Sequence, residues 1–159
     1  MDIQKLVEQH GNSRVNLLSI LHDLQNQSED NCLYMQSIEE LSEIMDIPVA
    51  EIVSTASFYT MFSLKPRGRH LIRLCISPPC YVMGEENILE AIQEKLGIGL
   101  GETTEDKMFT LEGSSCLGAC GVAPVCSIDD EFYGNLTREK IHRILDQVAA
   151  EEGAVSERN

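Results

Sequence analysis

The N-terminal part of the chain carries apolar side chains at helical spacing, three or four residues apart. We expect the third of its helices to begin in a capping box formed by Ser37 and Glu40, and the fourth to continue to about Phe62. A helical region of this size buries little surface alone, so it should pack on its neighbour or on a partner subunit. Four stripes predict the four buried helix faces: Ile3/Leu6/Val7/His10, Leu17/Ile20/Leu21/Leu24, Ile38/Leu41/Ile44/Met45 and Val49/Ile52/Val53/Ala56.

From His70 onward the pattern changes to short segments with branched residues, which are typical of strands. Strands are expected at 70–75, 107–112, 125–128 and 131–133. A helix that ends at Gly97 carries Ile88, Leu89, Ile92 and Leu96, and a last helix begins with Thr137 as its cap and carries Ile141, Ile144, Leu145 and Val148. The element order is therefore β-α-β-β-β-α, of the α+β or α/β class.

These changes of pattern divide the chain into a helical domain at 1–65, a second domain at 66–150 and a frayed tail at 151–159. The basic segment from Lys65 to His70 joins the two domains, and its Pro and Gly favour a connector, with a docking patch as the alternative.

Composition excludes several classes of function. The 159 residues carry a formal net charge of −14, which opposes binding to nucleic acid phosphates. The sequence contains no apolar run long enough to span a membrane. Its first residues lack the apolar region of a signal peptide. We therefore expect a cytoplasmic protein, free or in the soluble arm of a membrane-attached complex, whose thiols stay reduced and available to metal.

Two pairs of cysteines are the strongest chemical signal in the sequence. Four residues separate Cys75 from Cys80, and three separate Cys116 from Cys120. Four thiols in two loops can bind zinc or an iron–sulfur cluster, and spacing alone leaves both open, together with unligated or disulfide-bonded cysteines. Met83 stands where a plant-type ferredoxin has its third cysteine, so that loop is excluded.

Other motifs are weaker. Cys32 and Cys126 lie outside the pairs. Cys32 is expected to be a semi-buried bystander in the helical half, and Cys126 a small buried side chain, although Cys126 is close enough to be a spare ligand. None of the four histidines lies in a cysteine loop, which argues against a Rieske centre. The glycines at 97, 99 and 101 follow a helix and lack the last glycine of a dinucleotide fingerprint, so a helix end and a loop are expected there. The absence of C-x-x-C argues against dithiol exchange.

Four segments together resemble the thioredoxin-like [2Fe–2S] ferredoxin family. They are Cys75-x4-Cys80-Tyr-Val-Met-Gly, Thr103-Thr-Glu-Asp, Cys116-Leu-Gly-Ala-Cys-Gly-Val-Ala-Pro, and the stretch from Ala56 to His70. The family includes the 24-kDa-type subunit of respiratory complex I and related subunits of NAD(P)-linked hydrogenases and formate dehydrogenases. The resemblance implies a small helical bundle followed by a thioredoxin-like domain. It also implies one [2Fe–2S] cluster bound by Cys75, Cys80, Cys116 and Cys120.

The resemblance further implies an electron-transfer subunit of an NAD(P)H-linked oxidoreductase. FMN and NAD(P) are expected on a partner subunit, since no motif for either occurs in this chain. The host complex, whether complex I, a hydrogenase, a formate dehydrogenase or an electron-bifurcating enzyme, is not encoded in these motifs. A free ferredoxin shuttle and a zinc-stabilised interaction module are the alternatives.

Overall fold

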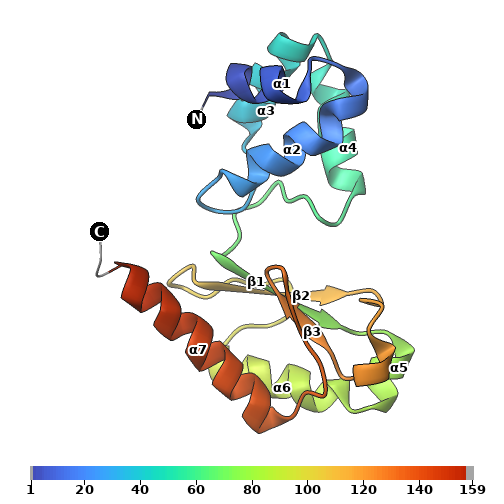
Figure 1. The fold of residues 1–159 in the computed structure, drawn as a ribbon, viewed down its shortest axis with the longest axis vertical. Coiled ribbons are helices and arrows are strands. Elements are labelled where there is room, and N and C mark those ends of the chain that lie inside the picture. The colour runs from blue at the N-terminus through green and yellow to red at the C-terminus, as the bar shows by residue number, and fades with distance from the viewer. Residues whose placement is uncertain (1, 157–159) are drawn as a thin grey trace. The chain divides into compact units, whose positions relative to one another are not determined.

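The computed structural model describes residues 2–156, with side chains described through Glu151. The chain divides between Arg67 and Gly68 into two compact units. The first unit contains four α-helices and one short 3₁₀ helix, shown in blue to cyan in Figure 1. Their bounds are α1 (Ile3–His10), η1 (Arg14–Asn16), α2 (Leu17–Asn26), α3 (Met35–Met45) and α4 (Val49–Phe58).

The apolar stripes of the first unit meet in one core, which confirms the predicted helical bundle. Asp2 caps α1 by accepting a hydrogen bond from Lys5 N–H, and Gly11 ends the helix at a φ of 83°. The largest fully buried side chains of this core are Ile3, Ile20, Leu21, Leu24, Leu33, Ile38, Leu41, Ile47 and Ile52.

Two helix ends in this unit differ from the prediction. The capping box is wrong, because α3 begins at Met35 and Ser37 lies inside the helix. The chain just ahead of α3 is held by a bond from Leu33 N–H to Ser63 O, so the helix can begin earlier. Helix α4 ends at Phe58 rather than near Phe62, because Tyr59 is extended.

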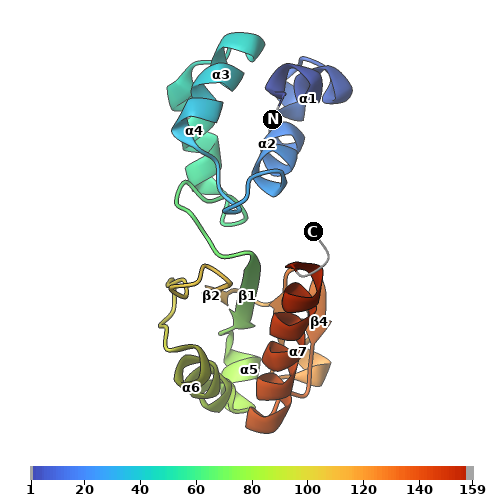
Figure 2. The same ribbon diagram turned by 90° about the vertical axis from the view of Figure 1, so that its left-hand side faces the viewer.

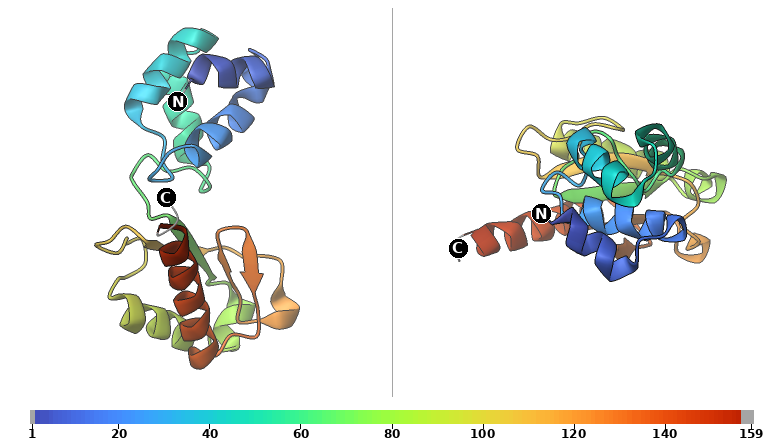
Figure 3. Two further views of the ribbon diagram at one scale, coloured as in Figure 1. Left: turned by 60° about the vertical axis from the view of Figure 1, so that its left-hand side comes forward. Right: turned by 90° about the horizontal axis from the view of Figure 1, so that it is seen from above.

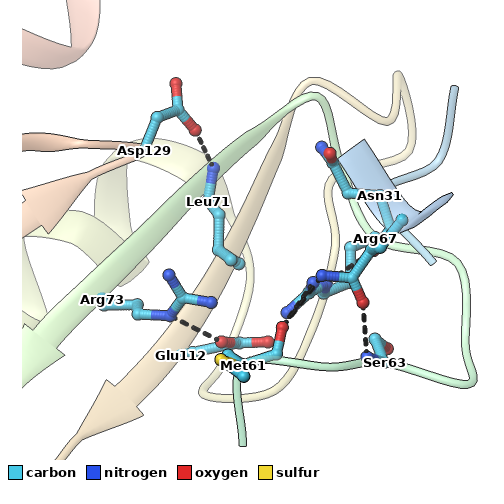
Figure 4. Close-up of polar contacts among 9 residues, drawn as sticks. Asn31, Met61, Ser63, Arg67, Leu71, Arg73, Glu112 and Asp129 are labelled. Atoms are coloured by element: carbon cyan, nitrogen blue, oxygen red, sulfur yellow. Dashed lines mark hydrogen bonds and ion pairs between the residues drawn. The ribbon is translucent and has the colours of Figure 1, made fainter. Parts of the chain in front are cut away.

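Arg67 closes the first unit and is 5% exposed. Its Nε donates to Asn31 O at 3.0 Å and its Nη2 to Met61 O at 3.4 Å (Figure 4). These contacts make Arg67 a structural part of the first unit, so it does not belong to an exposed basic patch.

The second unit is built on a four-stranded sheet with the order β2-β1-β3-β4. The central strand β1 (His70–Cys75) pairs in parallel with β2 (Phe109–Ser114) and antiparallel with β3 (Cys126–Ile128); β4 (Glu131–Tyr133) lies beyond β3. The register places Cys75 opposite Ser114. The chain therefore leaves both parallel strands at the same edge of the sheet.

Among the described residues, three α-helices and one short 3₁₀ helix complete this unit: α5 (Pro78–Val82), α6 (Glu85–Leu96), η2 (Cys120–Val122) and α7 (Arg138–Ser156). The observed order confirms the thioredoxin-like β-α-β-β-β-α prediction, with α5 as an additional short helix. Helices α6 and α7 pack against each other. Figure 1 draws α6 below the sheet and α7 running from beside the sheet to below it, and Figures 2 and 3 show both helices from other sides. Buried residues of the sheet and both helices form the main core: Ile72, Leu74, Ile88, Ala91, Ile92, Ile98, Phe109, Leu111, Cys126, Ile128, Leu136, Ile141, Ile144 and Leu145.

Polar contacts fix the strands of this sheet. Arg73 Nε lies 3.4 Å from Glu112 Oε2, a pair that faces across β1 and β2 (Figure 4). The turn between β3 and β4 is tied to β1, because Leu71 N–H donates to Asp129 Oδ1 at 2.8 Å (Figure 4).

The strand predicted at 107–112 begins later, because Lys107 has a φ of 56° and belongs to a turn. Thr137 caps α7 as expected, with its hydroxyl accepting from Lys140 N–H at 3.2 Å. Helix α7 runs through Ser156, so residues 151–156 of the expected tail are helical, whereas 157–159 lie outside the described residues. No helix within residues 2–156 is both long and apolar enough to cross a membrane.

Candidate metal centre

The first cysteine pair lies at the end of the central strand. Cys75 is the last residue of β1, and Cys80 lies within α5; both side chains are buried. Pro78 and Pro79 occupy the first turn of α5, where a missing N–H costs nothing. Two adjacent prolines would also suit a stiff loop, but the structure forms a helical turn over most of this segment.

The second pair follows β2 in a loop that is rich in small residues. Cys116 and Cys120 are both exposed, and their Sγ atoms are 3.4 Å apart. Gly118 N–H donates to Cys116 Sγ at 3.4 Å from a φ of 80°, a conformation that favours glycine. Gly118 thus directs a backbone N–H at a sulfur.

The two pairs meet at one edge of the sheet because β1 and β2 are parallel neighbours. Ile76 N–H donates to Ser114 O at 3.0 Å, and Cys75 N–H donates to Val125 O at 3.1 Å. Cys75 and Cys80 form a small core of their own with Ala123 and Val125, and Leu117 and Ala119 of the second loop pack against it. The loops therefore open at the same end of the sheet.

Electrostatic interactions link the thiols. The Cys75 and Cys80 side chains share a hydrogen bond, and Cys120 interacts with both. Cys116 is linked to this set through its contact with Cys120. Within residues 2–156, no three histidine, cysteine or acidic side chains stand at metal-binding distance. The sulfurs are neighbours but must close further to surround a metal.

Backbone N–H groups from both loops favour the thiolate at Cys75. Burial opposes ionisation of this thiol, but hydrogen bonds with the backbone of Ser77 and Leu117 outweigh it and leave the pKa of Cys75 below its ordinary value. Burial, followed by the bond with Cys75, raises the pKa of Cys80 to about 11. Four clustered thiols with N–H donors directed at sulfur suit the thiolate set of an iron–sulfur cluster.

Cys126 lies apart from this group. It sits on β3 opposite Leu74, is fully buried in the main core, and burial raises its pKa to about 12. Cys32 is buried in the first unit. Cys126 matches the expectation of a small buried side chain, whereas Cys32, at 2% exposed, is more deeply buried than the semi-buried position expected for it.

The histidines contact other groups. His10 pairs with Asp23 at 2.7 Å, and His142 Nε2 lies 3.1 Å from Ala91 O. His70 pairs with Asp129 at 2.8 Å. None of these contacts involves a cysteine loop.

The glycines after α6 form a helix end and a turn. Gly97 ends α6 in the left-handed conformation, and Glu102 Oε2 accepts from Gly99 N–H at 2.6 Å. The Glu102 carboxylate therefore accepts the hydrogen bond that Gly99 N–H would otherwise be able to donate to a phosphate. This contact agrees with the prediction of a loop.

An apolar surface around the cysteine loops was not predicted from the sequence. Its large exposed apolar side chains are Ile76, Tyr81, Val82, Met83 and Val122. The signal that could have found it is the absence of charge: residues 76–84 and 113–128 contain no Asp, Glu, Lys or Arg in a chain that is 24% charged.

The model of one protein family, described as thioredoxin-like [2Fe–2S] ferredoxin, matches residues 3–149. A subunit of the NADH-quinone oxidoreductase of Rickettsia felis is 39% identical over 92% of this chain and 86% of its own length. The corresponding subunit of Rickettsia conorii is 38% identical over 92% of this chain and 87% of its own length.

A solved structure of NAD⁺-reducing [NiFe]-hydrogenase in the H₂-reduced state shares the fold, with a TM-score of 0.77 and 24% identity over 88% of this chain. This chain spans 24% of that hydrogenase chain. The family match and the curated relatives lead to one conclusion: the chain belongs to the thioredoxin-like [2Fe–2S] ferredoxin family, whose cofactor is a [2Fe–2S] cluster.

Proposed function

We propose that this chain is an electron-transfer subunit of a multisubunit NAD(P)H-linked oxidoreductase, with Cys75, Cys80, Cys116 and Cys120 as its cluster ligands. The observation that carries the proposal is the meeting of two cysteine pairs at one sheet edge. The relatives from the two Rickettsia species, both named as subunits of NADH-quinone oxidoreductase, support the choice of host.

When bound, a [2Fe–2S] cluster supplies one-electron chemistry. The residues of this chain prepare its site. Cys75 and Cys80 offer sulfurs from a buried, preformed segment. Gly118 N–H, and the backbone of Ser77 and Leu117, provide hydrogen bonds that stabilise thiolate sulfur and would tune the reduction potential.

The surface around the loops supports contact with a partner. Tyr81, Val82 and Met83 follow Cys80 and are exposed, and Val122 follows Cys120. An uncharged surface can be dehydrated at low cost on docking, whereas the acidic remainder of the chain cannot. We propose that this surface contacts the subunit that carries FMN and NAD(P), because a short path helps single-electron exchange. A nicotinamide gives up a hydride, so it needs a flavin to pass single electrons to a cluster.

Reduction of the isolated subunit tests the proposal. The purified holo chain should be reduced by dithionite but not by NADH or NADPH, and it should bind no FMN. Adding the flavin subunit should make NAD(P)H reduce the cluster, followed by the reduced-state EPR signal.

The variant Tyr81→Ala should slow that reduction by weakening docking. Glu90→Ala, at an exposed position of α6, serves as the matched control. Reduction of a dye by NADH with the flavin-free subunit alone would contradict the proposal and indicate an enzyme in its own right.

A further inference from the structure

The six cysteines of this chain differ sharply in access to solvent. Cys32, Cys75, Cys80 and Cys126 are buried, whereas Cys116 and Cys120 are exposed. The two exposed thiols are also neighbours, with their sulfurs 3.4 Å apart. A reagent in solution therefore meets one pair of thiols first, and that pair is already in contact.

The loop that carries the exposed pair has room to close. A disulfide requires the sulfurs to approach to about 2.05 Å, so side-chain rotation and a small backbone shift must supply the difference. A Cβ atom placed on Gly118 or Gly121 would meet nothing within 4 Å, so no neighbouring group crowds the backbone there. The buried pair lies instead inside a packed apolar core.

We propose that Cys116 and Cys120 form an intramolecular disulfide in the cluster-free chain, by exchange with a low-molecular-weight disulfide such as oxidised glutathione. The Cys116 thiolate attacks one glutathione sulfur, the S–S bond of glutathione breaks, and one glutathione leaves as a thiol. The Cys120 thiolate then attacks the Cys116 sulfur and releases the second glutathione. The protein dithiol is oxidised, the glutathione disulfide is reduced, and the two thiol protons end on the two glutathiones.

This disulfide would keep the free subunit from taking up its cluster until it is reduced. That consequence rests on the proposed ligand set, because the disulfide removes two of the four ligands. The bond itself rests only on the exposure and contact of the two thiols.

The test uses the full chain, stripped of iron by a chelator under argon with a thiol reductant that is then removed. Incubation with oxidised glutathione should cost two titratable thiols, lower the mass by two hydrogens and give one cross-linked peptide pair that contains Cys116 and Cys120. Dithiothreitol should restore both thiols. A cross-link that involves Cys75 or Cys80, or no cross-link, would overturn the proposal.

Single variants sharpen this result. Cys116→Ser and Cys120→Ser should each stop at a stable adduct with one glutathione on the remaining exposed cysteine, and exposed positions of this kind tolerate serine without loss of folding. Cys32→Ala is the matched control and should form the same disulfide as the wild type. Equal glutathione adducts on Cys75 or Cys80 would show that burial does not protect that pair.

The holo chain separates this proposal from the proposed function. Bound as ligands, Cys116 and Cys120 should resist oxidised glutathione for as long as the visible chromophore persists. If the disulfide forms while the chromophore stays, the ligand assignment fails and the disulfide proposal stands. If the cluster-free chain forms no disulfide, this proposal fails whatever the holo chain does.

Discussion

The two cysteine loops carry the same chemistry on different supports. The first contains a helical turn, α5, and its two sulfurs lie inside a small apolar core. The second is rich in small residues, and both of its cysteines are exposed. Gly118 N–H donates to Cys116 Sγ, the two sulfurs are 3.4 Å apart, and Cys120 also interacts with the first pair. The protein therefore holds one pair in place by packing, and ligation must fix the position of the other.

Serine substitution of the four proposed ligands should give the largest effects. Each of Cys75→Ser, Cys80→Ser, Cys116→Ser and Cys120→Ser should remove or strongly perturb the visible chromophore and the reduced-state EPR signal. Cys32→Ala and Cys126→Ala should leave both. Bleaching by Cys126→Ala while Cys120→Ala stays coloured would show the ligand assignment to be wrong.

In the cluster-free chain, the same serine substitutions should lower the unfolding free energy by different amounts in the two loops. Cys80→Ser places a hydroxyl in the small apolar core and should cost about 1–3 kcal/mol of unfolding free energy. Cys120→Ser lies at the surface and should change that free energy by less than about 0.5 kcal/mol. Denaturant titration followed by circular dichroism measures both, and equal costs would remove the distinction between the loops.

Removal of the cluster should weaken the second loop most. Ligation contributes folding free energy, and about 1 kcal/mol already corresponds to roughly 4–8 °C in the melting temperature of a unit of this size. Hydrogen exchange should then rise more in residues 114–122 than in 75–82. A cluster-free chain that melts where the holo chain does would contradict this prediction.

Gly134→Ala should displace the second loop at Val122. A Cβ atom at Gly134 would lie 2.5 Å from Val122 Cγ2 and 2.9 Å from Val122 O, so the loop must move. Overpacking of this kind costs about 1–3 kcal/mol, and the EPR signal of the cluster should change shape. Gly121→Ala is the matched control in the same loop, since its Cβ meets nothing within 4 Å. A larger effect from Gly121→Ala would refute this account of the loop.

Glu85, just beyond the first loop, should give the smallest effect and one that depends on pH. This carboxyl opens α6 and is 4% exposed; burial, and then the neighbouring charge of Glu86, raise its pKa above the ordinary value of 4.5. The folded chain thus holds this proton more tightly than the unfolded chain. The resulting stabilisation is complete below the unfolded pKa and is lost as the pH rises through the folded pKa.

Glu85→Gln should therefore melt at a higher temperature than the wild type at pH 7, and the two curves should converge near pH 4. Exposed Glu86→Gln should shift the melting temperature less. A difference between Glu85→Gln and the wild type that is the same at both pH values would show that charge is not its cause.

Sequence reasoning predicted the elements that rest on local pattern. The branched segment from His70 to Cys75 gave β1 its observed bounds, and Gly97 marked the end of α6. Helix α5 was not predicted, because two adjacent prolines, Pro78 and Pro79, are also typical of a stiff loop, although proline fits the first turn of a helix.

Other features depend on contacts distant in sequence. Just ahead of α3, Leu33 N–H donates a hydrogen bond to Ser63 O. A contact between residues so distant in sequence cannot be predicted from a local pattern. Cysteine spacing likewise does not distinguish the buried pair from the exposed pair. Burial arises from Ala123 and Val125, which return to cover Cys75 and Cys80 after the second loop.

The small core around Cys75 and Cys80 is separate from the main core between the sheet, α6 and α7. Folding and cofactor insertion can therefore be separate events in time. The sheet and its two long helices can be complete before any iron arrives, while the exposed loop remains open to receive it. In a cell, the supply of iron and sulfide would then decide when a finished chain becomes competent to carry an electron.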